Sequence, residues 1–350
     1  MSMKTKTVNI FRLFLVFAVS ALTLASCGQP KESPEQVIQK FKEQATQITS
    51  GDISTEVTLN GSDTQDTMDF TANVNVKFDR RDEEQRKADI KGTASGMMKT
   101  ADKSFDGDID FGLRTINDEY FLRVDKLDIS SEEFKALQPQ LNNYMSKWLK
   151  VASDFIPKNV RDLQQKDEAT LAKEKQLKEL FINTPIFNVI KEYGVESANG
   201  NKVYHYGVQF NIDGVKDYIR KAAVIDGREL TDVEVEDASK IVSYISSAEL
   251  WIGTKDYYLY KATVGMTGGA GENTPDMNVT ISMEGADYNK AIDIKAPEGA
   301  QEFNPLELLM LYSAAQPAVI EPTDETVTEK MITDETTEEP VADTTEQPVE

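Results

Sequence analysis

The chain has 350 residues, of which 60 are acidic and 38 are basic, and its net charge at pH 7 is −22. No basic stripe is present to neutralise phosphates, so the composition argues against nucleic acid as a partner. One cysteine and one histidine exclude a disulfide framework, an HExxH motif and a multi-histidine metal site. We therefore expect a protein without disulfides, metals or cofactors.

The N-terminus reads as an export signal. Three basic residues precede an apolar run from Leu13 to Leu24. This run is shorter than the ~20 residues that span a bilayer, but it has the length of a signal-peptide core. It ends in Leu-Ala-Ser-Cys, which is typical of the bacterial lipobox. The sequence therefore predicts cleavage before Cys27 and lipidation of that cysteine.

Composition divides the rest of the chain. Residues 1–26 are the predicted signal peptide, and residues 27–32 are the lipidated cysteine and a short tether. Residues 33–315 are long enough for a single domain with one large core. Residues 316–350 hold eleven acids and one lysine among Thr, Glu and Pro. A segment with so few large apolar residues is predicted to be disordered.

A helix is expected at the start of the domain. Ser33 is a suitable N-cap, Pro34 suits the first helical position, and Gln36 completes a capping-box pattern. Four apolar residues then recur at helical spacing, which predicts one buried face. They are Val37, Phe41, Ala45 and Ile48.

Apolar and polar residues then alternate with a period of two, which indicates antiparallel strands with one buried face. In the first half the predicted strands are 53–59, 68–78, 88–98, 105–113 and 119–127, and a helical or irregular region is expected over 131–181. In the second half they are 186–195, 203–210, 248–253, 257–266, 277–283 and 291–296, with helices over 213–223 and 232–244. Asn199-Gly200 is the strongest hairpin signal in the chain.

These elements predict an α+β fold: a large, curled, mostly antiparallel sheet of about eleven strands, with too few helices to cover more than one face. Such a sheet tends to enclose a cavity beneath its helices. Several predicted strand residues lie on the apolar phase and would line that cavity. They are Phe70, Val74, Ile90, Phe111, Tyr260, Val264 and Ile281.

Three segments resemble a known family: S-P-E-Q-V-I-Q-K-F-K, K-V-Y-H-Y-G-V-Q-F and A-E-L-W-I-G-T-K-D-Y-Y-L-Y-K-A-T-V. Together with the lipobox and the order of elements, they resemble the LppX/LprG lipoproteins, which share the LolA/LolB half-barrel fold. The resemblance covers Ser33 to about Pro297. It implies a half-barrel whose helices cover the concave face, and an acylated lipid carried between sheet and helices.

Catalytic and metal motifs are weak. Asp106–Asp110 begins like a calcium loop, but Phe111 stands where the loop needs glycine, so the aspartates are interpreted as a solvated strand face. Gly268–Gly271 lacks a following Lys-Ser/Thr and is interpreted as a loop. His205 is interpreted as a hydrogen-bonded structural residue. We therefore expect a protein that is not an enzyme.

Two functions remain open. The first is a lipid-anchored carrier or binder of hydrophobic molecules. Methionines on the predicted strands would suit varied acyl chains. The alternative interpretation of these methionines is ordinary core packing. The second is a non-enzymatic scaffold of the cell envelope. Either protein would lie on the extracytoplasmic side of the cell membrane, or on the outer membrane if the organism has one, held by the lipid on Cys27.

Overall fold

The computed structural model describes residues 32–62, 66–82, 85–100, 104–156, 168–268, 276–304 and 306. The chain divides into two units, residues 1–315 and 316–350, and all described residues belong to the first. The predicted signal peptide, Cys27 and the predicted acidic tail lie outside the described residues. The domain boundaries drawn from the sequence therefore stay predictions.

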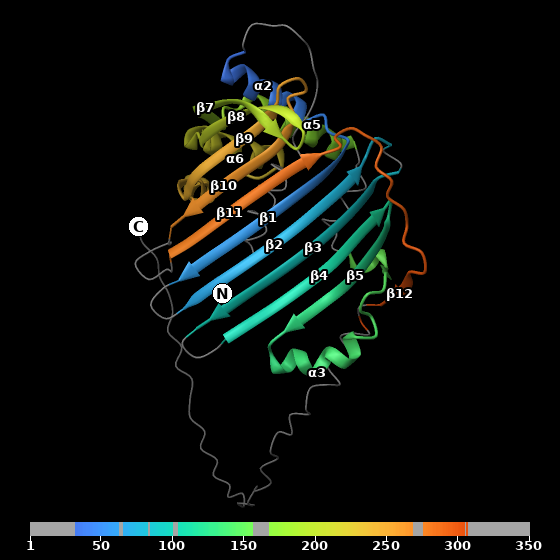
Figure 1. Ribbon diagram of the computed structural model, residues 1–350. Helices are drawn as coiled ribbons and strands as arrows, with labels where there is room; N and C mark the ends of the chain where they lie inside the picture. The colour runs from blue at the N-terminus through green and yellow to red at the C-terminus, as the bar shows by residue number, and fades with distance from the viewer. Residues whose placement is uncertain are drawn as a thin grey trace, which may run out of the picture. The chain divides into compact units, whose positions relative to one another are not determined.

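Twelve strands of the described chain form one open sheet, in the order β12-β6-β5-β4-β3-β2-β1-β11-β10-β9-β8-β7 (Figure 1). All neighbours are antiparallel except β12 and β6, which are parallel. The strands are β1 (Ser50–Ser62), β2 (Thr67–Asp79), β3 (Lys87–Lys99), β4 (Ser104–Ile116), β5 (Glu119–Ile129), β6 (Leu149–Val151), β7 (Phe187–Ala198), β8 (Asn201–Phe210), β9 (Ile245–Gly253), β10 (Leu259–Thr267), β11 (Asp276–Ala286) and β12 (Gln301–Phe303). The predicted α+β fold with a large, mostly antiparallel sheet is confirmed.

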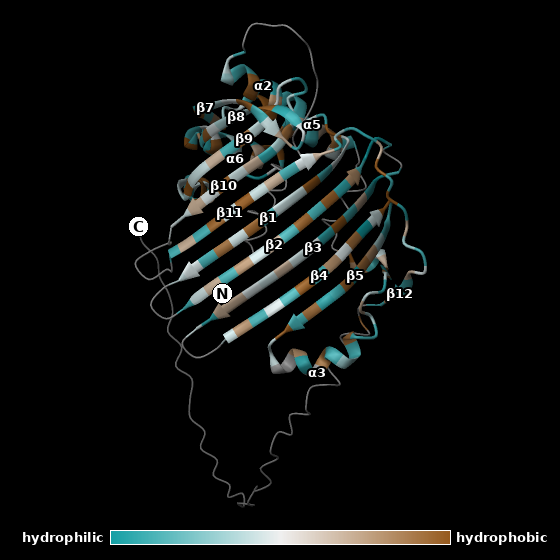
Figure 2. Ribbon diagram, viewed as in Figure 1, coloured by the Kyte–Doolittle hydropathy of each residue, from teal (hydrophilic) through white to brown (hydrophobic). Residues whose placement is uncertain are grey.

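The period-two pattern accounts for the long strands. Hydrophobic and hydrophilic residues alternate along them (Figure 2). Two tight turns follow the predicted chemistry: Asn199 and Gly200 both have positive φ, 50° and 76°, between β7 and β8, and Asn117 has φ 55° between β4 and β5. Asparagine and glycine adopt this left-handed conformation at low cost, so the turns fix the registers of both hairpins.

The strand predicted over residues 291–296 is wrong. This segment has no ladder, although Ile294 is buried. Its backbone groups are bonded by side chains instead: Ile292 N donates to Asp79 Oδ2 at 3.5 Å, and Arg114 Nη1 donates to the Lys295 carbonyl at 2.7 Å. Alternation alone therefore marked an extended segment that packs against the sheet without joining it.

The helices are α2 (Pro34–Ala45), α3 (Glu132–Leu141), α5 (Glu168–Asn183), α6 (Ile212–Ile225) and α7 (Asp232–Ser243), with a 3₁₀ turn η1 (Ser153–Phe155). Helix α2 has the predicted capping box: Ser33 Oγ accepts from Gln36 N at 3.3 Å, and Gln36 Oε1 accepts from Ser33 N at 3.0 Å. Helices α2, α5, α6 and α7 gather beside β7, β8 and β9 (Figure 1). The helical layer thus covers one end of the strand order.

The main core lies between these helices and the strands beside them. It joins side chains from α2, α5, α6 and α7 to side chains of β8, β9 and β10. Its members include Val37, Phe41, Phe181, Tyr206, Val208, Val215, Tyr218, Val242, Ala248, Leu250 and Ile252.

One cation is enclosed in this core. Lys42 of α2 is 4% exposed, its Nζ donates to the Thr184 carbonyl at 2.8 Å, and it lies 5.8 Å from the centre of the Phe181 ring. Burial lowers the pKa of Lys42 from 10.5 to about 8, and the nearby Glu43 only partly opposes this. The charged form is therefore less stable in the folded protein than in the unfolded chain.

We expect Lys42→Met to be more stable than the wild type at pH 7 by about 1–2 kcal/mol, after allowing for the lost hydrogen bond. Between pH 8 and 10.5 the folded wild type binds fewer protons than its unfolded chain, so its stability rises with pH. The advantage of the variant should therefore shrink across this window. Urea unfolding of both proteins at pH 7, 8.5 and 10 measures the difference, and a constant difference would contradict the prediction.

Candidate ligand-binding face

The strand register gathers one continuous apolar face. Residues that stand directly opposite each other in antiparallel strands point to the same side of a sheet. Four cross-strand rows contain apolar residues almost throughout. They are Ile281–Val57–Ala72–Ala94–Ile109–Leu127, Val279–Leu59–Phe70–Gly96–Gly107, Gly285–Ile53–Val76–Ile90–Leu113–Leu122 and Met283–Thr55–Val74–Gly92–Phe111–Val124.

The face continues through β11 and β10 into the main core. Val264 stands between Ile281 and Ala248, and Ala262 stands between Met283 and Leu250. Ala248 and Leu250 are buried in the core with the helices. The helices therefore cover the same face of the sheet that β1–β5 present, at its β7–β9 end.

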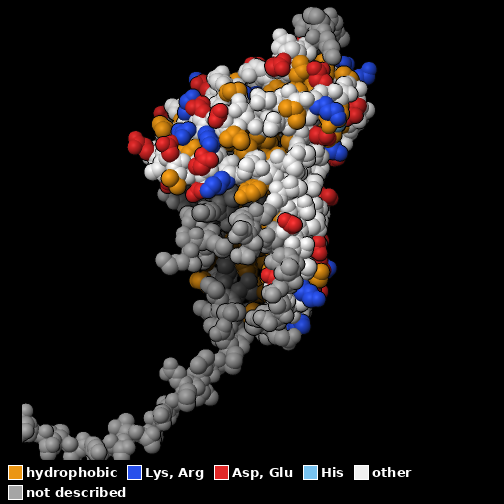
Figure 3. Space-filling model, turned by 90° about the vertical axis from the view of Figure 1, so that its left-hand side faces the viewer, with side chains coloured by type: hydrophobic (Ala, Val, Ile, Leu, Met, Phe, Trp, Pro, Cys, Tyr) orange, Lys and Arg blue, Asp and Glu red, His pale blue; other side chains and the backbone are white. Residues whose placement is uncertain are grey.

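Burial falls along this face. Ala248 and Leu250 are buried and Val264 and Ile281 are partly buried, whereas Phe70 on β2 is 39% exposed. Figure 3 shows hydrophobic side chains among charged ones on the part of the surface that carries the helices. The apolar face is thus a core surface beside the helices and is most accessible at the ends of β2, β3 and β4, where Met68, Met98 and Phe105 lie.

A row of large side chains lies at the exposed edge of the apolar face. We call Met277 of β11, Met68 of β2, Met98 of β3 and Phe105 of β4 the Met/Phe row. Gly61 of β1 stands between Met277 and Met68, and each of the other members stands directly opposite the next. Met68, Met98 and Phe105 are each more than a third exposed. Exposed apolar patches of this kind mark ligand grooves or contact surfaces, and methionine adapts its shape to varied partners.

The opposite face of the sheet is charged. The row Asp52–Lys77–Asp89–Arg114 alternates in sign across four strands, with ion pairs of 3.1 Å between Lys77 and Asp52 and 2.9 Å between Arg114 and Asp89. Lys126 pairs with Asp108 at 2.8 Å. The sheet is therefore amphipathic, and the Asp108 side chain is part of a solvated strand face, as interpreted from the sequence.

The structure places six of the seven predicted lining residues on the apolar face. Phe70 is exposed, and Val74, Ile90, Phe111, Val264 and Ile281 are partly buried. Tyr260 is 8% exposed in the main core, where its hydroxyl donates to Asp256 Oδ2 at 2.6 Å and burial raises its pKa. Cys27 lies outside the described residues. That these residues line a ligand cavity stays a prediction.

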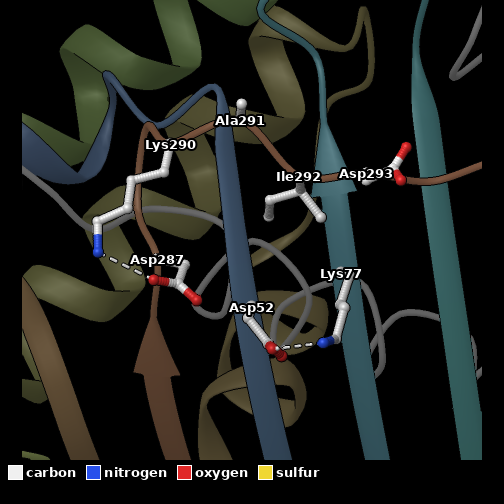
Figure 4. A pocket seen from close by; sticks show the side chains of 7 residues that line it. All are labelled: Asp52, Lys77, Asp287, Lys290, Ala291, Ile292 and Asp293. Atoms are coloured by element: carbon white, nitrogen blue, oxygen red, sulfur yellow. Dashed lines mark hydrogen bonds and ion pairs between the residues drawn. The ribbon is translucent and has the colours of Figure 1, made fainter.

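A cavity of about 300 Å³ is polar and lies elsewhere (Figure 4). Lys77 and Asp52 pair on one side of it, and Lys290 and Asp287 pair at 2.9 Å on another. It is lined by Asp52, Lys77, Asp287, Lys290, Ala291, Ile292 and Asp293. This lining is unlike the apolar surface that an acyl chain needs.

His205 lies at the centre of an aromatic stack on the strands β7, β8 and β9. Its ring lies 4.1 Å from the rings of both Tyr193 and Trp251, with interplanar angles of 15° and 17°. Its Nδ1 is 3.0 Å from Glu196 and its Nε2 is 3.1 Å from Glu249. The interpretation of a hydrogen-bonded structural histidine fits this geometry. No sequence pattern indicates the stack, because its members come from three strands.

Among the described residues, no group of three or more His, Cys, Asp or Glu side chains is placed to hold a metal ion. No helix in the described ranges is long and apolar enough to cross a membrane.

No protein-family model and no curated protein matches the sequence. Solved structures with a similar arrangement include the lipoprotein LppX from Mycobacterium tuberculosis, at 8% identity over 75% of this chain and 100% of that one, with a TM-score of 0.27. A domain described as an outer membrane lipoprotein-sorting protein, from Vibrio parahaemolyticus, has 10% identity over 74% of this chain and 93% of its own, with a TM-score of 0.19. A DUF1329 family protein from Desulfovibrio piger has 9% identity over 75% and 92%, with a TM-score of 0.17.

LppX is one of the lipoproteins named in the group that the sequence segments resemble. Identities near 10% and TM-scores below 0.5 carry no argument about function, which has to come from the residues of this chain.

Proposed function

We propose that this protein is an extracytoplasmic lipoprotein, anchored through Cys27, that binds lipids or other hydrophobic molecules on the apolar face of its sheet. The observation that supports this most is the graded burial of that face. A sheet that served only as packing surface would be covered along its whole apolar side, because exposed apolar area is unfavourable in water. Here Met68, Phe70, Met98 and Phe105 remain accessible.

The chemistry of the face favours an acyl chain over a polar ligand. Apart from Thr55 on β1, the rows described above contribute no hydrogen-bonding side chain, whereas the ion pairs lie on the other side of the sheet. Binding would therefore depend on apolar burial, at about 25 cal/mol per Å². Such binding should change little with ionic strength, because no ion pair contributes to it.

Two adjacent methionines give a matched test. Met98 lies on the apolar face opposite Met68 and Phe105, and Met97 lies on the other face opposite Asp69 and Asp106. Their exposed fractions, 42% and 44%, are almost equal. We expect Met98→Gln to weaken binding of a fluorescent fatty acid about fivefold, equivalent to roughly 1 kcal/mol of lost apolar contact. We expect Met97→Gln to bind like the wild type.

Fluorescence titration of the chain from residue 28 onward measures both dissociation constants. Both variants should melt within a few degrees of the wild type, since each side chain is already accessible to water. If no fatty acid binds at micromolar concentration, the envelope scaffold replaces this function. Equal weakening by both variants would show that binding does not use the apolar face.

A further inference from the structure

A cluster of three side chains holds the chain where the described residues begin. The Glu32 carboxylate accepts a hydrogen bond from the Tyr257 hydroxyl at 2.7 Å and forms an ion pair with Lys40. Lys40 Nζ also lies 3.2 Å from the Tyr257 hydroxyl and 4.7 Å from the centre of its ring. We call Glu32, Lys40 and Tyr257 the tether clamp.

Within the clamp Glu32 is largely shielded from solvent, whereas the Lys40 side chain is 37% exposed. The Glu32 side chain is 13% exposed. Burial alone would raise the pKa of Glu32, but the hydrogen bonds from Lys40 and Tyr257 outweigh it and lower the pKa. The carboxylate is therefore ionised and bound to both partners at neutral pH.

Tyr257 has an unusual backbone for its residue type. Its φ is 56°, in the left-handed region that favours glycine or asparagine. It lies in the β9–β10 turn, where its N–H donates to the Gly253 carbonyl at 3.1 Å. A bulky residue persists in such a conformation when surrounding contacts hold it there. The contacts of its side chain with Glu32 and Lys40 supply them.

Both sides of the clamp are fixed to the fold. Lys40 belongs to α2, whose Val37 and Phe41 are buried in the main core. The β9–β10 turn is closed by a hydrogen bond of 2.7 Å from Gly253 N to the Tyr258 carbonyl. The chain N-terminal to Glu32 therefore leaves the domain from a defined place.

Four residues separate Cys27 from Glu32, so five Cα–Cα steps join them. A fully extended chain of this length reaches at most about 18 Å. The 13-residue strand β1 extends about 43 Å at 3.3 Å per residue. The end of the sheet that carries the clamp is thus within reach of a bilayer that holds Cys27, whereas the Met/Phe row lies a strand length away along β1.

We propose that the tether clamp orients the domain, with the β9–β10 turn and the start of α2 facing the phospholipid surface and the Met/Phe row directed away from the anchoring membrane. This inference rests on the proposed lipidation of Cys27. Two exposed lysines, Lys202 and Lys255, lie at the clamp end, where the Lys202 carbonyl accepts from Thr254 N at 3.0 Å. In this orientation Lys202 and Lys255 face the anionic headgroups, and so does the acidic Glu35 of the first helical turn.

Site-specific fluorescence tests the orientation. Cys27 is the single cysteine, and once lipidated it does not react with thiol labels. Full-length lipidated protein carrying Lys255→Cys or Lys99→Cys is labelled with bimane in vesicles of phosphatidylcholine and phosphatidylglycerol, 3:1. A nitroxide on the lipid headgroup quenches nearby fluorophores. We expect at least threefold stronger quenching at position 255 than at position 99.

Opening the clamp should remove this difference. In a Tyr257→Gly background the ratio should fall below twofold, because the tether then leaves the domain freely. Glu32→Gln, which needs no change in the fold, should lower it in the same direction. Asn117→Gly is the matched control: Asn117 also has positive φ, 55°, but lies in the β4–β5 turn, and its N–H donates to Arg86. This variant should keep the wild-type ratio.

A second arm separates this inference from the proposed anchor. A hexahistidine tag replaces residues 1–27 and binds vesicles that contain a nickel-chelating lipid. If Cys27 proves unlipidated but the tagged chain keeps the threefold ratio, the anchor is wrong and the orientation stands. Equal quenching at positions 255 and 99 in the tagged chain, or a ratio unchanged by both clamp variants, overturns the orientation.

Discussion

Replacing Cys27 with serine is expected to abolish lipidation and with it the stable attachment of the protein to the membrane. In the proposed anchor the thiol of Cys27 accepts the lipid, and the sequence contains one cysteine. Each buried methylene of an acyl chain contributes about 0.8 kcal/mol, so two chains anchor a protein stably, whereas a protein without acyl chains is not held at the membrane in this way. The apolar run from Leu13 to Leu24 is too short to replace them as a stable span.

Radioactive palmitate labelling in cells, followed by detergent extraction, measures this effect. The wild type should carry label and partition into detergent, and Cys27→Ser should do neither. Ser26→Ala keeps a small residue before the cysteine and should behave like the wild type. Labelling of Cys27→Ser at the wild-type level would show that the lipid is attached elsewhere.

The long strands could be predicted from the sequence because local pattern and tertiary structure agree there. The alternation over residues 88–98 corresponds to β3, Lys87–Lys99, and its direct neighbours β2 and β4 are joined to it through short connections. Strands joined in this way pair with each other in most folds. The three-residue strands β6 and β12 were missed, because strands so short carry no periodic signal of their own, and β12 pairs with β6 across 149 residues of chain.

The sequence predicted which residues share the apolar face, but not which part of that face the helices cover. Alternation placed Phe70, Val74 and Ile90 on one phase, and the register confirms that they share a face. The part of this face that the helices cover depends on the short connections between the helices and the neighbouring strands. Helix α6 begins two residues after β8 and α7 ends two residues before β9, so both fold back over the strands that they join. The helices therefore do not reach the end of the face where Met68, Phe70 and Met98 remain exposed.

The aromatic stack around His205 shows the other limit of sequence reasoning. Tyr193, His205 and Trp251 come from three strands, and β-bulges in the β7–β8 pairing shift their relative positions. A bulge adds a residue to one strand only, and therefore changes which side chains meet across the ladder. Without the register no pattern in the sequence brings these three rings together.

Gly285→Ala is expected to be the most destabilising single substitution among those considered. Gly285 lies on β11 opposite Ile53, and a Cβ there would overlap the hydroxyl and Cζ of Tyr288 and come within 2.9 Å of the Leu259 carbonyl. Tyr288 is 6% exposed, stacks on Tyr258 at 4.8 Å and donates to the Leu259 carbonyl at 2.7 Å. The Tyr288 ring is buried against Tyr258 and Tyr260, so we expect the clash to displace it and break its hydrogen bond.

Overpacking of this kind costs about 1–3 kcal/mol, and the lost buried hydrogen bond adds about 1 kcal/mol. We therefore expect a total near 3 kcal/mol, which for a domain of this size lowers Tm by roughly 6–12 °C. Gly61→Ala is the matched control on β1, because a Cβ there meets Met277 Cγ at an ordinary 3.4 Å, and its Tm should change little. Adding Tyr288→Phe to Gly285→Ala removes the overlapping hydroxyl and should recover part of the loss. Thermal unfolding of the four proteins measures this, and equal melting of Gly285→Ala and Gly61→Ala would show that Tyr288 does not occupy the space beside Gly285.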